Sequence, residues 1–257
     1  MKAFSLASGS KGNAYLVEQD GVVLLIDCGL SCRELCRRMQ GVGLSPSQIA
    51  AIFFTHSHAD HIDGLRVFHA HHPQPELYAN LMTAESIAAL TGVDEGDFAC
   101  FENGQEVSVG PFTITGFSIP HDTSDPVGYL VRAGGVSYFH GTDIGCPLDS
   151  VGRMLAEADF ATLESNHDPV LLRQSGRPSQ LISRIAGPRG HLSNAEACDL
   201  VRRFASPRLK CLSLAHLSRD CNEPHLAEGA MRAVLTGMER SDVGLRILSQ
   251  DLPMALF

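Results

Sequence analysis

The segment Thr55-His56-Ser57-His58-Ala59-Asp60-His61 constrains this chain more than any other feature of its 257 residues. It directly follows the apolar run Ile52–Phe54, which is typical of a buried strand. Imidazole and carboxylate groups crowded into one loop at a strand end can face two adjacent metal ions, which isolated histidines cannot do. We expect the first two histidines to face one ion, and the aspartate and last histidine the other. The alternative, a surface segment rich in histidine, suits His69, His71 and His72 better, and these are interpreted as solvent-facing helix residues without a role.

Composition places the chain among ordinary globular proteins. Its apolar fraction is 44%, and apolar runs such as Val22–Ile26 are much too short to cross a membrane. The first ten residues lack the long apolar stretch of a secretory signal, which predicts a soluble, cytoplasmic protein with no membrane partner. A chain of this length is expected to form a single domain over residues 1–257, or two fused half-domains. Its oligomeric state stays open.

Apolar runs rich in β-branched residues alternate with helix-like stretches along the chain. Strands are predicted at Ala3–Leu6, Ala14–Glu18, Val22–Asp27, Ile52–Phe54, Leu77–Ala79, Phe112–Ser118, Gly128–Val131, Val136–Phe139, Phe160–Leu163, Cys211–Leu214 and Arg246–Leu248. Ser31 with Glu34, and Ser193 with Glu196, fit capping boxes at helix starts. Early strands are expected as hairpins, with later ones alternating with helices. The pattern predicts an α/β layered fold in which two mixed β-sheets are flanked by helices.

The eight cysteines do not resemble a disulfide framework, because a domain of this size needs no covalent cross-links. Three of them, Cys28, Cys32 and Cys36, fall along a probable helix entrance. A zinc site there would require further ligands and lacks the paired CxxC spacing of zinc fingers. Packing of buried thiols is the favoured interpretation, and the zinc site is the alternative.

The net charge of −9 argues against a protein that coats nucleic acid by general electrostatics. The charges are nevertheless uneven, because the range from Arg173 to Arg219 holds nine basic residues and only two acidic ones. Such asymmetry fits a phosphate-binding face on an otherwise acidic body. Ordinary solvated helix faces fit the charges equally well.

Five short motifs follow one another in an order that resembles the metallo-β-lactamase superfamily. They are Asp27 after Val22–Ile26, the HxHxDH segment, His121 in Pro-His-Asp, Asp143 in Gly-Thr-Asp, and His216 in Ala-His-Leu-Ser. The resemblance implies the αββα sandwich of that family. It also implies that Asp27 supports the ligand loop and that Asp143 bridges two metals. The implied metal ligands are His56, His58, Asp60, His61, His121, Asp143 and His216.

The resemblance narrows to the bacterial YycJ (WalJ) branch, which is described as exonuclease-like. It is carried by Ser8–Asn13, Thr55–His61, Glu164–Asp168, Gly190–Asn194 and Ala215–Asp220. This branch implies a phosphodiesterase that acts on nucleic acid, with DNA ends expected rather than RNA and digestion in the 5′-to-3′ direction. One departure is His140-Gly141 ahead of Asp143, where an apolar pair is usual, so we expect the preceding strand to end early.

A second similarity concerns residues beside the metals. Glu164, followed by His191, is similar to motifs of the ribonucleases that process the 3′ end of transfer RNA, in which a glutamate and a histidine form a relay. It implies that Glu164 orients His191, which then protonates the leaving oxygen. Phosphate binding at the helix that Ser193 caps is the alternative role for this region. Asn13, Ser193 and His167 are the candidate substrate-binding residues, and Asp60, Glu164 and His191 the candidate catalytic ones.

The ligand set suggests the chemistry. Two divalent ions sharing Asp143 and a water would lower the pKa of that water and generate a hydroxide that attacks phosphorus. Zinc is the default metal, although manganese and iron suit the same donors. Two other function classes stay open. One is a small-molecule hydrolase of cyclic phosphodiesters, thioesters or lactones, and the other is a binding scaffold without catalysis, which a complete ligand set disfavours.

Overall fold

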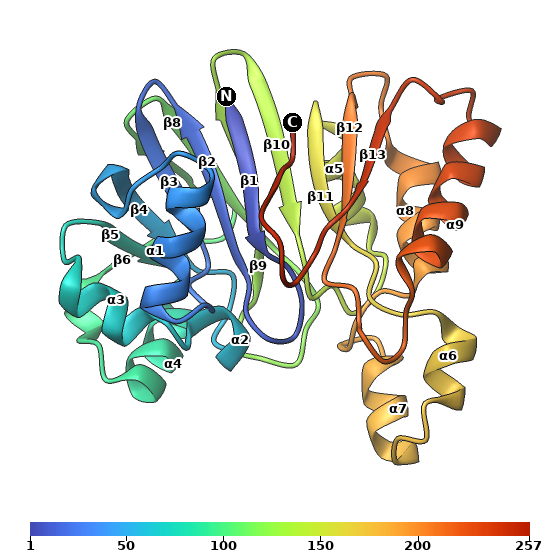
Figure 1. The fold of residues 1–257 in the computed structure, drawn as a ribbon, viewed down its shortest axis with the longest axis horizontal. Helices are drawn as coiled ribbons and strands as arrows, with labels where there is room; N and C mark the ends of the chain where they lie inside the picture. Colours follow the sequence, from blue (N-terminus) through green and yellow to red (C-terminus); the bar gives the residue numbers. More distant parts are fainter.

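The computed structural model describes residues 1–257 and arranges them in four layers, with helices outside two facing sheets (Figure 1). Each sheet has seven strands. The first sheet has the order β14 (Met254–Ala255), β1 (Lys2–Ala7), β2 (Ala14–Gln19), β3 (Val22–Ile26), β4 (Ile49–Phe53), β5 (Glu76–Ala79) and β6 (Phe98–Cys100). The second has the order β13 (Gly244–Ile247), β12 (Cys211–Ala215), β11 (Phe160–Glu164), β10 (Val136–Gly141), β9 (Val127–Ala133), β8 (Phe112–Ser118) and β7 (Glu106–Val109).

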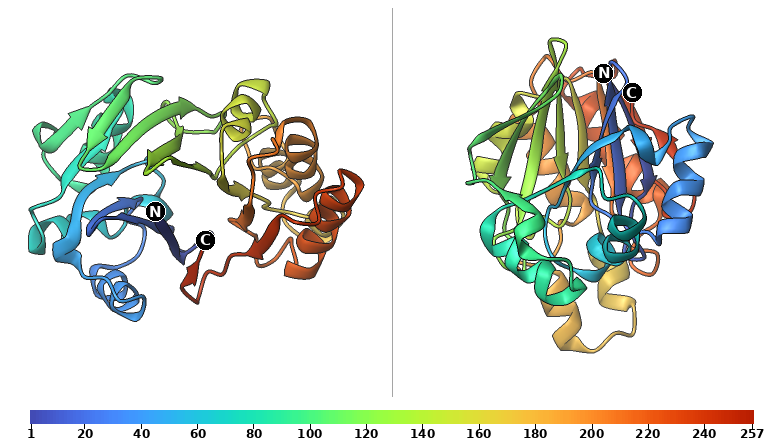
Figure 2. Two further views of the ribbon diagram at one scale, coloured as in Figure 1. Left: turned by 90° about the horizontal axis from the view of Figure 1, so that it is seen from above. Right: turned by 90° about the vertical axis from the view of Figure 1, so that its left-hand side faces the viewer.

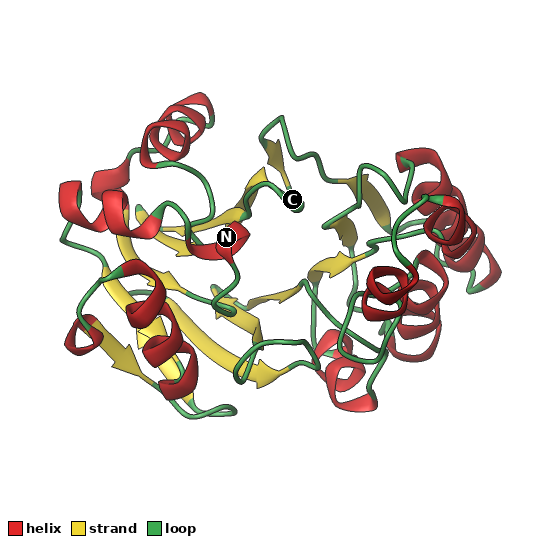
Figure 3. Cartoon of the chain, turned by 90° about the horizontal axis from the view of Figure 1, so that it is seen from below, coloured by secondary structure: helices red, strands yellow, loops and turns green.

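Helices cover the outer face of each sheet, as Figure 3 shows in red against the yellow strands. Along the chain they are α1 (Cys32–Gly41), α2 (Ala59–Ile62), α3 (Leu65–His71), α4 (Leu81–Thr91), α5 (Asp149–Ala156), α6 (Pro169–Gln174), α7 (Ser179–Ile185), α8 (Asn194–Phe204) and α9 (Pro224–Gly237). Two short 3-10 turns lie at Pro46–Gln48 and Glu95–Asp97. No helix combines the length and the apolar character needed to cross a membrane.

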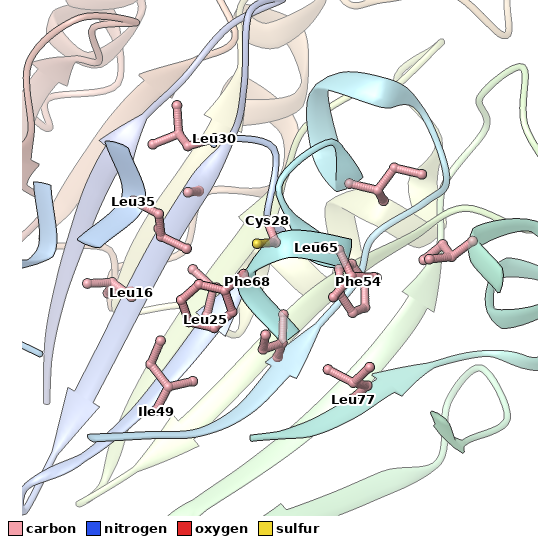
Figure 4. Close-up of a cluster of buried hydrophobic side chains, with 14 of the residues drawn as sticks. Leu16, Leu25, Cys28, Leu30, Leu35, Ile49, Phe54, Leu65, Phe68 and Leu77 are labelled. Atoms are coloured by element: carbon pink, nitrogen blue, oxygen red, sulfur yellow. The ribbon is translucent and has the colours of Figure 1, made fainter. Parts of the chain in front are cut away.

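Three apolar clusters hold the four layers together, because each sheet buries both of its faces. One cluster lies beneath α1, α3 and α4 and includes Leu25, Phe54 and Phe68 (Figure 4). A second lies beneath α5, α8 and α9. The third fills the space between the sheets and includes the buried rings of Tyr15 and Tyr129. The α/β sandwich of two mixed sheets flanked by helices is therefore confirmed.

Each half of the chain repeats one topology. In the first sheet β1, β2 and β3 are antiparallel, and β3 to β6 are parallel. In the second, β7 to β10 are antiparallel, and β10 to β13 are parallel. The expectation that hairpins come early and helix-linked strands late is wrong, because this change happens once in each half. Seen from above in Figure 2, the blue strands of one half face the green strands of the other.

All eleven predicted strands are present. The strand β8 has the predicted bounds, and the others have shifted ends. Three strands were not predicted, and β10 is longer than expected, since it continues through His140 and Gly141. The strand does not end early because His140 pairs with Tyr129 in β9 and Thr162 in β11, while its ring is fully buried. Ser193 and Glu196 form the predicted capping box. Ser31 caps α1, but the Glu34 side chain bonds arginines instead.

Candidate metal centre

The candidate ligands meet at one edge of the sandwich because they follow strands that point the same way. In the second sheet β8, β10 and β12 share a direction, and His121, Asp143 and His216 come just after their ends. The segment Thr55–His61 follows β4 in the first sheet. Figure 1 shows α2, which contains the end of this segment, beside the ends of these strands. Two loops from different sheets therefore supply donors to one place.

Three imidazoles form the first group of donors. His56 Nε2 lies 3.1 Å from His58 Nδ1, and His58 Nδ1 lies 3.2 Å from His121 Nε2. His121 is oriented from behind, because its Nδ1 donates to the Gly190 carbonyl at 3.0 Å and so leaves Nε2 facing the group. Burial lowers the pKa of all three imidazoles, most strongly that of His56. Neutral imidazoles present lone pairs, which is the state that binds a metal.

A second group combines two imidazoles with a carboxylate. Asp60 Oδ2 lies 3.6 Å from His61 Nε2 and 3.5 Å from His216 Nε2. His61 is held by Asp27, whose Oδ2 accepts from His61 Nδ1 at 2.7 Å. Asp27 Oδ1 also accepts the Thr55 backbone N–H at 2.8 Å. Asp27 thus lies behind the ligand loop and fixes one of its rings, the supporting position that the resemblance implied.

Asp143 lies between the two groups. Its Oδ2 is 3.3 Å from His61 Nε2, and its Oδ1 is 3.8 Å from His121 Nε2 and 3.5 Å from His216 Nδ1. The side chain is buried, yet Oδ2 has no hydrogen-bond partner. A buried carboxylate oxygen without a partner is costly unless a cation binds it.

The charges of this region fit divalent cations. Four carboxylates, of Asp27, Asp60, Asp143 and Glu164, converge here, and none of them pairs with a lysine or arginine. Burial alone would lower the pKa of His216, but Asp143 together with Asp60 and Glu164 raises it to about 10. Burial would also lower the pKa of His61, but the carboxylates of Asp27, Asp60 and Asp143 raise it. Protons on the His61 and His216 imidazoles therefore offset the negative charge of the carboxylates. Two metal ions would offset the same charge and bind the nitrogen atoms that these protons occupy.

Glu164 and His191 form the pair that the sequence suggested. His191 Nδ1 lies 2.8 Å from Glu164 Oε1, while Glu164 Oε2 accepts the backbone N–H groups of Ile144 at 2.8 Å and Leu192 at 3.0 Å. Burial lowers the pKa of His191, but the neighbouring Glu164 carboxylate outweighs this and raises it. Glu164 is fully buried, whereas His191 reaches the cavity described next.

A cavity of about 230 Å³ opens beside the donors. It is lined by Ser10, His58, Asp60, His121, Asp122, Asp143, Arg177, Leu181, Arg184, Ile185, Gly190, His191 and His216. A neighbouring cavity of about 270 Å³ shares Ser10 and Arg177 with it and adds Lys11 and Arg219. The helices α6 and α7 project past the sheets on this side (Figure 1). The donors are therefore accessible. Basic side chains line the route to them, and its three arginines pair with Asp220, Asp122 and Asp251.

Comparison with known proteins agrees with this geometry. A family profile described as "Beta-lactamase superfamily domain" matches residues 23–213. The chain belongs to the metallo-β-lactamase superfamily. It is 32% identical to exodeoxyribonuclease WalJ of Streptococcus pneumoniae over 245 residues, which cover 94% of this chain and 90% of the relative. It is 31% identical to exodeoxyribonuclease YycJ of Bacillus anthracis over 231 residues, which cover 90% and 87%.

Solved structures share the superfamily fold at low sequence identity. The zinc-bound PqqB of Methylobacterium extorquens superposes with a TM-score of 0.71 at 16% identity, over 99% of both chains. The similarity concerns the fold alone.

The three candidate substrate-binding residues do not line the cavity beside the donors or the cavity next to it. Asn13 is buried, and its amide donates to Asp60 Oδ2 at 3.2 Å, so it contacts a donor rather than solvent. The Ser193 hydroxyl bonds Glu196 within the capping box of α8. His167 is 2% exposed and packs beside Ser193 through a backbone bridge. These placements disfavour direct substrate contact, and Asn13 instead positions Asp60.

Several residues of the site carried no signal in the sequence alone. Thr55 precedes the ligand residues in the motif, and its hydroxyl donates to Asp27 Oδ2 at 2.9 Å. Asn166 donates to the His216 carbonyl at 2.8 Å and orients a candidate ligand. Asp122 lies 3.6 Å from His58 Nε2 and pairs with Arg184. Asn166 lies within Glu164–Asp168 and Asp122 is the last residue of Pro-His-Asp, so the motifs contain both residues without indicating their roles.

The basic range from Arg173 to Arg219 is not one face. Arg177, Arg184 and Arg219 line the two cavities. Arg208 and Lys210 instead pair with Asp159 at 3.0 and 3.3 Å, just before β11, so they lie at the opposite end of the sheet from the ligands. The basic residues are therefore divided between the cavities and the far end of the sheet, and a phosphate-binding role for those at the cavities stays a prediction.

Proposed function

We propose that this chain is a dinuclear metal-dependent phosphodiesterase that degrades DNA from its ends. The observation that carries the proposal is the pair of donor groups joined by Asp143, beside an open cavity with the Glu164–His191 pair in its wall. One ion would be held by His56, His58 and His121, and the other by Asp60, His61 and His216. We further propose that residues 1–257 act as one domain, since both halves supply donors.

The bound ions would activate a water molecule and offset charge on phosphoryl oxygens. Zinc suits a set of five imidazoles and two carboxylates, and manganese or iron suits the same donors. The eight cysteines are all free, which supports action in the reducing cytoplasm.

The protein's own groups have two tasks around the scissile bond. Glu164 accepts from His191 Nδ1 and fixes the ring, so that a proton on Nε2 can pass to the departing oxygen. Asn13 and Asp27 hold Asp60 and His61 in place. Cleavage of a phosphodiester needs the metal ligands in position. It also needs the proton donor, because an alkoxide leaves slowly without a proton.

The polymer substrate is supported by charge beyond the cavity. Lys11, Arg177 and Arg219 line the adjoining hollow, and basic side chains of this kind contact the phosphate backbone of nucleic acids. A small substrate would need none of them. This chain covers 90% and 87% of the two relatives named exodeoxyribonuclease. This similarity supports DNA as the substrate and attack from an end.

End-labelled oligonucleotides test the proposal directly. Protein loaded with zinc or manganese is incubated with duplex DNA, single-stranded DNA and RNA labelled at either end, with Asp143→Ala as the inactive control. We expect DNA labelled at the 5′ end to release mononucleotide label at once, and DNA labelled at the 3′ end to shorten gradually. No cleavage of any nucleic acid by metal-loaded protein would overturn the proposal.

A small-molecule hydrolase is the competing function, and two variants separate it from a nuclease. Lys11→Ala and Arg219→Ala remove positive charge outside the cavity that holds the donors. For a nuclease both raise KM for DNA and leave hydrolysis of a nitrophenyl phosphodiester unchanged. Fast turnover of a cyclic nucleotide, thioester or lactone, with no effect of either variant, would favour the small-molecule function.

A further inference from the structure

A separate cluster of metal-binding side chains lies on the outer face of the first sheet. The thiols of Cys32 and Cys36 and an imidazole nitrogen of His72 all lie within 4.8 Å of one another. Cys36 Sγ is 3.8 Å from His72 Nε2. None of the three belongs to the centre described above, which contains no sulfur donor.

Two neighbouring helices bring these groups together. Cys32 and Cys36 are one helical turn apart in α1, so they share a face. His72 is the C-terminal cap of α3, which packs against α1. The interpretation of His72 as a solvent-facing residue is therefore wrong, because its ring is half-buried and lies 4.8 Å from that of Phe68.

Core packing does not account for these two thiols as it does for Cys28. Figure 4 shows the Cys28 sulfur among the apolar side chains of Leu65 and Phe68, and this residue is fully buried. Cys32 and Cys36 are partly exposed at the edge of that cluster, where an ion can reach them. The fourth position of a tetrahedral site would face solvent.

We propose that Cys32, Cys36 and His72 bind one zinc ion, as a site distinct from the dinuclear centre. Two thiolates and a neutral imidazole are suitable ligands for Zn²⁺, with a water molecule in the fourth position. Zinc–sulfur and zinc–nitrogen bond lengths place two such donors ~3.6 Å apart around a tetrahedral ion, close to the distance between Cys36 and His72. Binding releases both thiol protons, and the two thiolates balance the charge of the ion.

The position of the site gives it a structural consequence. The helix α3 follows α2 after two residues, and α2 begins directly after His58. An ion between α1 and α3 therefore fastens the far end of the segment that starts with the HxHxDH ligands. The site goes beyond the proposed phosphodiesterase and does not depend on it.

Cobalt substitution distinguishes this site from the dinuclear centre. Only a thiolate ligand gives Co²⁺ a sulfur-to-metal charge-transfer band in the near ultraviolet. Metal-free, reduced protein is titrated with Co²⁺, and the wild type is expected to develop the band. The double variant Cys32→Ser with Cys36→Ser should lose it, and His72→Gln should weaken it. The matched controls Cys100→Ser and His71→Gln should retain it.

Two measurements make the outcome decisive. Zinc content after reconstitution should fall by one ion per chain in the double variant and stay constant in the controls. In the wild-type protein, added zinc should slow alkylation of Cys32 and Cys36 but not of the exposed Cys100. This measurement does not depend on the folding of any variant. A wild type without the band, a band that survives the double variant, or equal alkylation with and without zinc would overturn the proposal.

Discussion

Three residues of the site have a backbone conformation that L-amino acids rarely adopt. Asp27, Asp143 and His216 have φ values of 61°, 58° and 55°. For residues with a side chain this region costs on the order of 1–3 kcal/mol each and persists where the surroundings enforce it. Each of the three comes just after a strand, where the left-handed turn directs the side chain to the shared edge of the sheets. Glycine would relax the backbone but remove the donor or its support.

Asp143→Asn tests, at this scale, the carboxylate that lies between the two donor groups. The change keeps the shape of the side chain and removes its charge, so we expect turnover to disappear and bound metal to fall below two ions per chain. The metal-free variant should melt lower than the metal-free wild type. Although burial opposes ionisation, the charges of His216 and His61 hold the pKa of Asp143 well below its usual range, so the ionised carboxylate stabilises the folded protein. Activity assays, elemental analysis and thermal melting of both forms check this. Full activity in the variant would exclude Asp143 as a bridging ligand.

His191→Ala separates leaving-group chemistry from metal binding. We expect the variant to keep both metals and to cleave DNA slower by a factor of roughly 10² to 10⁴, the usual contribution of a general acid. Nitrophenolate departs without a proton, so hydrolysis of a nitrophenyl phosphodiester should be nearly unchanged. Rates on both substrates provide the measurement. An equal loss on both would point to phosphate binding, and no loss on either to a purely structural histidine.

The candidate metal ligands could be predicted because their side chains are specific in type and close in sequence, or follow strands at recognisable positions. Among the residues that hold them, Asp27 was implied by the resemblance, but the role of Asn13 could not be predicted. Asn13 is 47 positions from Asp60, and only the fold shows that its amide contacts that carboxylate. The pairing of Glu164 with His191 was predictable only through the resemblance to a known relay.

At the scale of elements, two glycines allow close contact between the loop before α1 and the segment that runs from α2 to the N-cap of α3. A Cβ atom on Gly29 would lie 1.8 Å from the Asp60 carbonyl oxygen, and one on Gly64 would lie 1.8 Å from that of Leu30. The backbone hydrogen bond from Gly64 to Cys28 fixes the same contact at 2.9 Å. The ligand segment is therefore placed by backbone packing as well as by side chains.

Gly64→Ala should displace this contact. We expect a loss of about 1–3 kcal/mol in the free energy of unfolding, the range for overpacked sites, together with weaker metal binding. The control is Gly41→Ala, since Gly41 lies in α1 with nothing near its added Cβ atom, and it should be neutral or stabilise by roughly 0.5 kcal/mol. Urea unfolding and metal titration measure both effects. Equal behaviour of the two variants would show that the contact is not needed.

Glu34 orients Arg38, which links α1 to β1 in the first sheet and to the backbone of Gln250. The Glu34 carboxylate accepts from Arg38 Nε at 2.6 Å, while Arg38 Nη1 donates to the carbonyls of Leu6 at 2.7 Å and Gln250 at 2.8 Å. Hydrogen bonds from Arg37 and then Arg38 lower the pKa of Glu34 from 4.5 to about 2. Ionised Glu34 therefore stabilises the fold above pH 4.5, and this contribution disappears as the pH falls through about 2.

Glu34→Gln should lower the melting temperature at neutral pH, and its difference from the wild type should shrink between pH 4.5 and about 2. The comparison is Glu228→Gln, which removes an exposed pair with Arg232 and should change stability little. Thermal melts across this pH range test it. A difference that is constant with pH would exclude the carboxylate charge as its origin.

Most of the strands that could be predicted, such as β3 and β12, have apolar runs because they are buried on both faces. Those that could not are short or exposed. The strand β6 has three residues, β14 has two, and β7 at the sheet edge is largely exposed in the sequence Glu-Val-Ser-Val. Their pairing depends on neighbouring strands rather than on their own composition.

At the scale of the whole molecule, each donor group combines the two halves of the chain. The first takes His56 and His58 from one half and His121 from the other. The second takes Asp60 and His61 from one half and His216 from the other. Because the two halves have the same topology, the ends of equivalent strands face each other, and both donor groups lie between these ends. Metals bound here would join the halves in addition to the apolar cluster between the sheets.

Removal of the metals should therefore loosen the contact between the halves without unfolding either one. A site in 100-fold excess of ligand over its Kd adds about 2.7 kcal/mol to the native state, which corresponds to a rise of roughly 5–10 °C in melting temperature for a chain of this size. We expect chelation to reverse that rise and to increase amide exchange in the loops that hold the donors, while strands such as β2 and β9 stay protected by the cluster between the sheets. Thermal melting and hydrogen exchange of holo and chelated protein measure this. If the chelated protein melted at the same temperature as the holo form, metals would not couple the two halves, and that coupling would rest on the apolar cluster alone.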